Sequence, residues 1–306
     1  MKMWTIYWEF ARPFTLLMPA IGMIAGGIIA WGAGPRFHSN WTASPWVVVQ
    51  KIAAGALMAA ILNAGSNGLN QIYDLEIDRI NKPRRPLPSG RLPLRQAWGF
   101  TGITIALGLM LGWTVNWECL LLAATATLLT ACYSVPPART KRWGILANIT
   151  VAIPRGFLLP VAGWSTVKTV LMPEPWLLCL PLGLFIVGSV TTKDFSDIEG
   201  DRAGGCKTLP VRYGVRKTAL IIAPFFILPF LLWPILASAG FLSASSAGIY
   251  LLSALLPILG AYIDFRIVRH PEELSGEENH ISWKLIYLMA ILAYAGLAVS
   301  YLLPKN

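Results

Sequence analysis

The chain is dominated by nine apolar segments, each close to the 20 residues that an α-helix needs to cross a bilayer. Only 13% of the residues are charged, 55% are hydrophobic and the mean hydropathy is +0.58, which excludes an ordinary soluble domain. The expected fold is therefore an all-α integral membrane protein with nine transmembrane helices. The segments cover residues 14–34, 46–72, 96–115, 117–134, 144–164, 176–193, 218–238, 244–264 and 282–303.

Lys and Arg are distributed unevenly between the two sides of this expected bundle. Twenty of the 25 lie before the first segment or in loops on the same side as the N-terminus, four lie on the other side, and Arg155 lies within a span. Because positively charged loops stay in the cytoplasm, we expect a multi-pass protein of the cell membrane with a cytoplasmic N-terminus. The net charge of +10 is then mostly a topology signal and gives no support for nucleic-acid binding.

One acidic motif occurs twice, each time where an apolar segment meets a basic loop. It reads Asp-Leu-Glu-Ile-Asp-Arg at 74–79 and Asp-Ile-Glu-Gly-Asp-Arg at 197–202. Carboxylates at i and i+4 share one face of a helix and repel each other, so the motif indicates a bound cation. Oxygen ligands favour Mg²⁺ or Ca²⁺ over zinc. The alternative is a coincidence of acidic helix caps, but seven of the 15 acidic residues lie at 74–78 and 194–201.

The spacing of the two motifs predicts that they share one end of the bundle. They are 123 residues apart with four predicted helices from one to the other, so both reach the cytoplasmic face in the same orientation. We interpret this as a parallel repeat within one domain, 1–306, with halves 1–140 and 141–265 followed by the ninth helix. The acidic faces of the second and sixth helices would then face each other across a central cavity.

The residues around each motif combine carboxylates with basic side chains. Asn70, Asp74 and Asp78 are predicted to follow one helical face, and Asp194, Asp197 and Asp201 another. Three prolines between 81 and 90 forbid helix and favour a stiff turn. Carboxylates that can bind a metal, next to basic side chains that can bind phosphate oxygens, suit a metal-bridged diphosphate. The candidates for binding the diphosphate are Lys82, Arg85 and Lys193, together with Tyr133, Ser134 and Lys141 of a third loop. Arg139 of the same loop is either a site residue or an ordinary residue of a positively charged cytoplasmic loop.

Arg155 is a candidate site residue because a charge within a membrane span is unfavourable without a function or a partner. We expect it to face the cavity and, together with Asn148 one to two turns earlier, to contact an anionic or carbonyl acceptor. The alternative is a bond to a backbone carbonyl that Pro154 or Pro160 leaves free.

These motifs together resemble the intramembrane prenyltransferases of the UbiA superfamily. The likeness covers residues 10–215 and includes Arg12-Pro13 and the Tyr-Ser-x-Pro-Pro loop at 133–137. It implies nine helices around a cavity, Mg²⁺, and transfer of a prenyl group from its diphosphate to an acceptor. It also implies that Asn70, Asp74, Asp78, Asp197 and Asp201 hold the metals, with Asp194 a further candidate, and that Arg12 joins the basic residues that bind the diphosphate.

The run Asp-Ile-Glu-Gly-Asp-Arg, followed by Lys-Thr-Leu-Pro at 207–210, is most similar to two branches of that family, which prenylate a glycerol-phosphate lipid or chlorophyllide. The homogentisate branch, which makes quinone precursors, is close behind. We favour a geranylgeranyl-type donor and a geranylgeranylglycerol-phosphate-type lipid acceptor. A terpene cyclase of the same fold and a secondary transporter are the alternatives, and the position of the acids at helix ends argues against the transporter.

Overall fold

The computed structural model describes residues 2–33, 44–276 and 280–304, and these ranges contain helices and no strands. Nine helical stretches within them are long and apolar enough to cross a membrane. Each matches a predicted segment to within three residues at both ends, except that the eighth continues to Arg269, five residues further than predicted. The stretches are Pro13–Gly32, Pro45–Tyr73, Leu94–Val115, Trp117–Ser134, Ile145–Ser165, Pro173–Phe195, Val215–Ser238, Ser246–Arg269 and Ile281–Leu302.

Five of the nine spans are single helices: α3 (Pro45–Tyr73), α5 (Leu94–Val115), α6 (Trp117–Ser134), α15 (Ser246–Arg269) and α17 (Ile281–Leu302). The other four are interrupted, and they consist of η1 (Pro13–Leu16) with α2 (Leu17–Gly32), α7 (Ile145–Ala152) with η3 (Ile153–Leu158) and α8 (Leu159–Ser165), α9 (Pro173–Ser189) with η4 (Val190–Phe195), and α12 (Val215–Ile222) with α13 (Pro224–Ile227), η5 (Leu228–Leu231) and α14 (Leu232–Ser238). Short elements connect the spans: α1 (Met3–Ala11), α4 (Leu75–Asn81), η2 (Thr140–Arg142), α10 (Ile198–Ala203), α11 (Leu209–Tyr213) and α16 (Glu273–Gly276).

Proline explains two of the interruptions, because it removes a backbone donor and clashes with the preceding turn. Pro154 lies in the π-helical turn η3, and Pro229 lies in the 3₁₀ turn η5. π-Helical turns within helices are rare and are frequently found at functional sites. In this bundle the π-helical turn carries Arg155.

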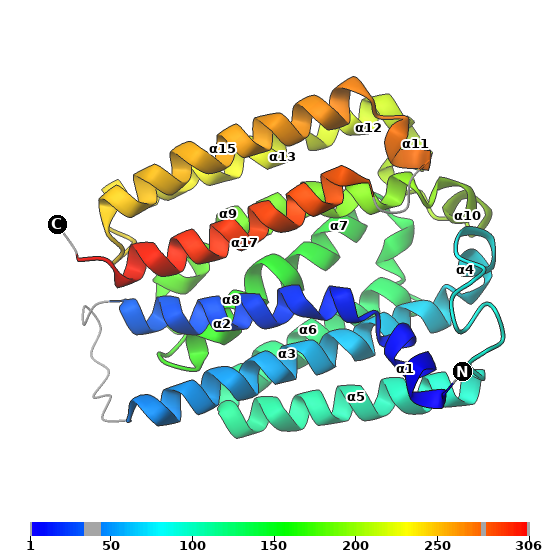
Figure 1. The fold of residues 1–306 in the computed structure, drawn as a ribbon, viewed down its shortest axis with the longest axis horizontal. Helices are drawn as coiled ribbons and strands as arrows, with labels where there is room; N and C mark the ends of the chain where they lie inside the picture. Colours follow the sequence, from blue (N-terminus) through cyan, green and yellow to red (C-terminus); the bar gives the residue numbers. More distant parts are fainter. Residues whose placement is uncertain (1, 34–43, 277–279, 305–306) are drawn as a thin grey trace.

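The long helices run alongside one another, and the short helices α4, α10 and α11 gather at one end of the bundle (Figure 1). Helix α2 packs against α3, α8 and α17, and α9 packs against η3, α7 and α13. In the interior, the ring of Phe185 packs against the buried rings of Phe226 and Phe230. Many large apolar side chains on α5 and α15 are exposed, as expected for surfaces that face lipid rather than water. The two acidic motifs lie at the end of α3 with α4 and at η4 with α10.

Candidate active site

Both acidic motifs have the same local backbone, which differs from the continuous helices that we predicted. The α-helical path is interrupted at Asp74 (φ −100°, ψ 13°) between α3 and α4, and at Asp197 (φ −111°, ψ 7°) before α10. The backbone bonds nevertheless continue, since Asp78 N donates to Asp74 O and Asp201 N donates to Asp197 O. The first aspartate of each motif therefore lies at a bend, and the second lies one turn into a short helix.

The two motifs face each other, as the sequence predicted. Lys141 of η2 donates from Nζ to Asp74 Oδ2 at 2.6 Å and lies 3.9 Å from Asp201 Oδ1. These two carboxylate oxygens are therefore at most 6.5 Å apart, the sum of the two distances. All three side chains are buried. One ammonium group thus compensates a carboxylate from each half of the site.

Two further contacts join the motifs. Lys82 Nζ lies 3.2 Å from Asp197 Oδ1. Asn81, at the end of α4, donates from Nδ2 to Asp197 O at 3.0 Å and accepts from Gly200 N at 2.8 Å. A Cβ at position 200 would lie only 2.6 Å from the Asn81 side chain, so a larger residue there would displace Asn81 from these bonds. This role of Asn81 could not be predicted from the sequence, because a hydrogen bond between distant segments leaves no local pattern.

Burial and neighbouring charges act in opposite directions on the pKa values of the carboxylates and of Lys141. Burial raises the pKa of Asp201 to about 6, the Lys141 charge opposes this, and the Asp197 charge adds to it. Burial also raises the pKa of Asp78, while Arg85, which donates to both oxygens of Asp78 at 3.1 and 3.0 Å, lowers it. Burial is the largest single influence on the pKa of Lys141 and lowers it, but the charges of Asp74, Asp201 and other neighbouring groups together outweigh burial, and the net shift is upward. Cations are thus needed to keep this site ionised.

The third loop contributes more to the site than we predicted. Arg139, whose role the sequence left open, donates to Asp74 Oδ1 at 3.3 Å and to Tyr73 O at 3.1 Å. The hydroxyl of Tyr133 accepts a 3.0 Å bond from Lys193 Nζ. Ser134 is buried, and its hydroxyl has no hydrogen-bond partner in the described part of the chain.

Asp194 lies in η4 beside the second motif. It is buried, and its Oδ1 lies 3.9 Å from Lys193 Nζ. Asn70 lies in the last turn of α3, where its Nδ2 donates to Asp74 Oδ2 at 2.7 Å. Both residues therefore adjoin the paired aspartates and keep oxygen atoms that could take part in metal binding.

Arg12 lies at a backbone break between α1 and η1, where its φ of 58° is left-handed. Amide side chains along α3 hold the break: Gln71 donates to Phe10 O at 2.8 Å and Asn67 donates to Ala11 O at 3.0 Å. The pKa of Arg12 is lowered to about 10, first by burial and then by the positive charges of Arg85 and Arg155. This crowding of guanidinium groups favours an anion between them.

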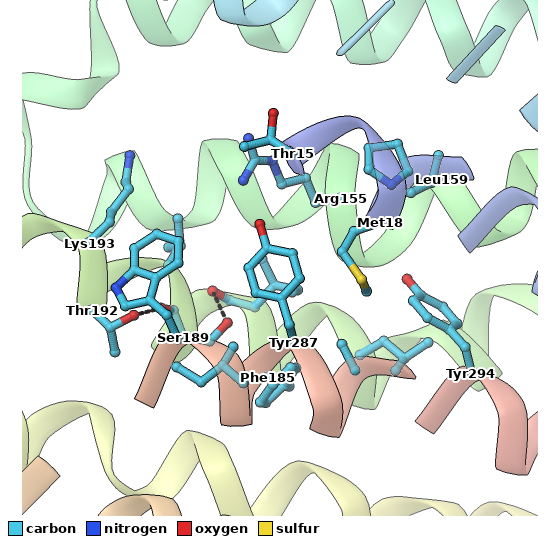
Figure 2. Close-up of a pocket in the computed structure, with 17 residues that line it drawn as sticks. Thr15, Met18, Arg155, Leu159, Phe185, Ser189, Thr192, Lys193, Tyr287 and Tyr294 are labelled. Carbon is cyan, nitrogen blue, oxygen red and sulfur yellow. Dashed lines mark hydrogen bonds between the residues drawn. The ribbon is translucent and has the colours of Figure 1, made fainter. Parts of the chain in front are cut away.

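A cavity lies next to these charges, between η1, α2, η3, α8, α9, η4 and α17. Arg155 and Lys193 are its charged lining residues, and most of the remaining wall is apolar or aromatic. Tyr287 points from α17 toward Arg155 and Thr15, and Lys193 lies apart from these three residues (Figure 2). Arg155 makes no hydrogen bond or ion pair within the described ranges, so the alternative of a bond to a carbonyl freed by proline does not hold. Lys193 connects the cavity to the aspartates.

Asn148 does not line this cavity, although we predicted that it would contact an acceptor. It is buried between α7 and α9, where its Nδ2 donates to Val187 O at 3.0 Å and to the hydroxyl of Thr191. Helix packing thus uses both donors of the amide. Sequence reasoning also missed Thr15 and Tyr287, because a hydroxyl within an apolar span reads as ordinary packing or as part of an interfacial belt.

The donor set of the site suits Mg²⁺. In the described ranges no three Asp, Glu, His or Cys side chains surround one metal position. Mg²⁺ is, however, usually held by one or two carboxylates together with substrate phosphates and waters, rather than by a complete protein cage. Two rows of buried carboxylates that face each other, with cations between them, fit that mode of binding.

The comparisons with known proteins agree with this fold. The model of the UbiA prenyltransferase family matches residues 22–285. The chain belongs to this family, which makes it a membrane-bound prenyltransferase.

Several relatives and solved structures are similar over most of the chain. The digeranylgeranylglyceryl phosphate synthase of Methanopyrus kandleri is 33% identical, covering 84% of this chain and 90% of the relative. A probable homogentisate phytyltransferase of rice is 34% identical, covering 70% of this chain and 57% of the relative. A solved digeranylgeranylglyceryl phosphate synthase superimposes with a TM-score of 0.70 at 26% identity, covering 99% of both chains. A homologue from Archaeoglobus fulgidus, solved with GPP and Mg²⁺, shares the fold with a TM-score of 0.69 at 21% identity, covering 95% of this chain and 99% of that one.

Proposed function

We propose that this prenyltransferase moves a geranylgeranyl-type group from its diphosphate to a geranylgeranylglycerol-phosphate-type lipid, with Mg²⁺ as cofactor. The observation that carries the proposal is the shared contact of Lys141 with Asp74 and Asp201. This contact joins the two acidic motifs next to the cavity that Arg155 and Lys193 line. We also propose that this end of the bundle faces the cytoplasm, because most Lys and Arg residues are predicted to lie on that side.

The residues divide into two groups with different tasks. We assign the metal contacts to Asp74, Asp78, Asp197 and Asp201, with Asn70 and Asp194 beside them. When bound, Mg²⁺ supplies positive charge that stabilises the departing diphosphate. Lys82, Arg85, Lys141 and Lys193 of the chain, with Arg12, Tyr133 and Ser134, would donate to the phosphate oxygens.

The cavity suits the prenyl carbon from which the diphosphate departs. As the carbon–oxygen bond breaks, this carbon becomes positively charged, and water would capture it. Phe185, Trp283 and Tyr287 line the cavity, where aromatic faces stabilise positive charge and exclude water. Attack by a hydroxyl oxygen of the acceptor forms the new carbon–oxygen bond and releases a proton, while the diphosphate departs with the bonding electrons.

The acceptor assignment rests on Arg155 and on the relatives. The Arg155 guanidinium pairs with no group of residues 2–33, 44–276 and 280–304 and lies in a mostly apolar cavity, which suits an amphipathic acceptor with an anionic head. The relative from Methanopyrus kandleri is named for the lipid reaction, and the match covers 90% of its length. The rice relative is named for a homogentisate acceptor, which also carries an anionic group. Identification of the reaction product is therefore needed to distinguish the lipid acceptor from homogentisate.

The decisive experiment incubates the purified protein in lipid nanodiscs with geranylgeranyl diphosphate, Mg²⁺ and one acceptor at a time. We expect release of pyrophosphate together with a new ether lipid, identified by mass spectrometry, only with the glycerol-phosphate lipid. Removal of Mg²⁺ with EDTA should stop both. Prenylated homogentisate or chlorophyllide would overturn the acceptor assignment. A hydrocarbon formed without any acceptor would identify a cyclase.

Arg155 gives a separate prediction about the acceptor. Replacing Arg155 with Gln should raise the KM for the lipid acceptor by about ten- to a hundred-fold, the usual effect of losing a hydrogen bond to a charged group. Steady-state kinetics with the acceptor and then the donor varied would measure this, and the KM for the prenyl diphosphate serves as the internal control. A rise in the donor KM alone would assign Arg155 to the diphosphate instead.

A further inference from the structure

A second hollow lies at the aspartate end of the bundle and shares no lining residue with the cavity described above. Its wall is formed by Arg142 and Trp143, which follow the third loop, and by Lys207, Val211 and Arg212, which follow the second acidic motif. The two segments are held together, since Lys207 N donates to Arg142 O at 3.1 Å. Gly144 has a φ of +52°, and a Cβ there would lie 3.1 Å from Lys207 O. Backbone contacts thus hold the two segments that line the hollow next to each other.

The charges that line this hollow are all positive. Arg142, Lys207 and Arg212 line it without any carboxylate. Lys82, Arg85 and Lys141 of the active site each have an aspartate within 3.2 Å, but none of the three cations of the hollow forms an ion pair within the described ranges. The Arg212 guanidinium lies over the ring of Tyr213, 5.2 Å from its centroid. Three cations around one concave surface repel one another, so the hollow favours an anion.

The position of the hollow indicates a membrane source for that anion. Two spans begin beside it, Ile145–Ser165 directly after Gly144 and Val215–Ser238 three residues after Arg212. Trp143 and Ile145 are exposed next to the cations. An exposed indole at a span boundary is typical of the level of the lipid head groups. Basic pockets between transmembrane helices are also where anionic lipids bind.

We propose that Arg142, Lys207 and Arg212 bind the phosphate head group of an anionic membrane lipid, while Trp143 packs against its glycerol and acyl region. This site is separate from the prenyl transfer site and does not depend on the proposed acceptor. Arg142 directly follows Lys141, which contacts Asp74 and Asp201. A bound lipid would therefore steady the loop that carries the central lysine of the active site.

The test measures lipid binding directly, by native mass spectrometry of protein released from nanodiscs of phosphatidylcholine with increasing phosphatidylglycerol. We expect wild-type protein to retain phosphatidylglycerol in preference to phosphatidylcholine. Each Arg or Lys near the membrane surface contributes about a five-fold gain in affinity, so the triple variant Arg142→Gln, Lys207→Gln, Arg212→Gln should lose about a hundred-fold. The matched control is Arg95→Gln, Arg216→Gln, Lys217→Gln, which removes three exposed cations that do not line the hollow.

Each outcome decides the proposal. Retention that falls in the first triple variant and persists in the control supports a lipid site. Equal losses in both variants would mean non-specific attraction to a basic surface, and unchanged retention in both would mean that the hollow does not bind lipid. If millimolar inorganic phosphate in neutral nanodiscs raises the Tm of wild-type protein as much as phosphatidylglycerol does, the ligand is a soluble anion. Any of these three results overturns the proposal.

Discussion

Replacing Asp74 with Asn should lower kcat/KM for prenyl transfer by at least about a hundred-fold, the range seen when a contact to developing charge is lost. Asp74 is buried at the bend between α3 and α4, where Asn70, Arg139 and Lys141 all donate to its carboxylate. An amide keeps the size of the side chain and removes its charge. The site would then bind Mg²⁺ more weakly, so the Mg²⁺ concentration for half-maximal rate should rise as well.

The matched controls are Glu76→Gln and Glu199→Gln. These two acids occupy the same position in the two motifs, two residues after Asp74 and Asp197, and both are exposed. Glu76 pairs with Arg79 on the surface, away from the buried carboxylates. We expect both controls to keep the wild-type rate and Mg²⁺ dependence. If Asp74→Asn has the same Mg²⁺ dependence as Glu76→Gln, Asp74 does not contribute to a metal site.

The sequence predicted the spans and the meeting of the acidic motifs because both depend on strong local signals. Twenty apolar residues have few alternatives to a membrane helix, and the side of the membrane on which a motif lies follows from counting helices. The acidic motifs interrupt the apolar pattern at its ends, so they were visible as well. The third loop was recognised as basic and on the same side of the membrane, and this was enough to predict Lys141 as a site residue.

The parts that the sequence did not reveal depend on contacts between distant segments. Asp78 N still donates to Asp74 O and Asp201 N to Asp197 O after each bend, and neither glycine nor proline occupies the bend itself. Asn81 and Asn148 have the same donors and acceptors, yet the first joins the two motifs and the second joins α7 to α9. Tertiary packing decides which partner an amide finds. The same holds for Arg139, because the sequence alone does not distinguish a site residue from an ordinary residue of a positively charged loop.

Replacing Lys141 with Met should destabilise the metal-free protein, because its ammonium group compensates buried carboxylates from both motifs. Removing one partner of a buried ion pair costs about 3 to 5 kcal/mol. Thermal unfolding in detergent should show a lower Tm, whereas Lys141→Arg, which keeps the charge, should lose less. Arg79→Met removes the exposed partner of Glu76 and should leave the Tm close to that of the wild type.

Addition of Mg²⁺ should restore most of the decrease in Tm that Lys141→Met causes. Without the ammonium, Asp74 and Asp201 form a more negative site, which binds a divalent cation more tightly, and a ligand of the folded state stabilises in proportion to the logarithm of its concentration over Kd. The rise in Tm on adding Mg²⁺ should therefore be larger in Lys141→Met than in wild-type protein. An equal rise in both would mean that Mg²⁺ does not bind near Asp74 and Asp201. Turnover should stay low even at high Mg²⁺, because the metal can replace the charge of Lys141 on the carboxylates but cannot replace the hydrogen bond that we propose Lys141 donates to the diphosphate.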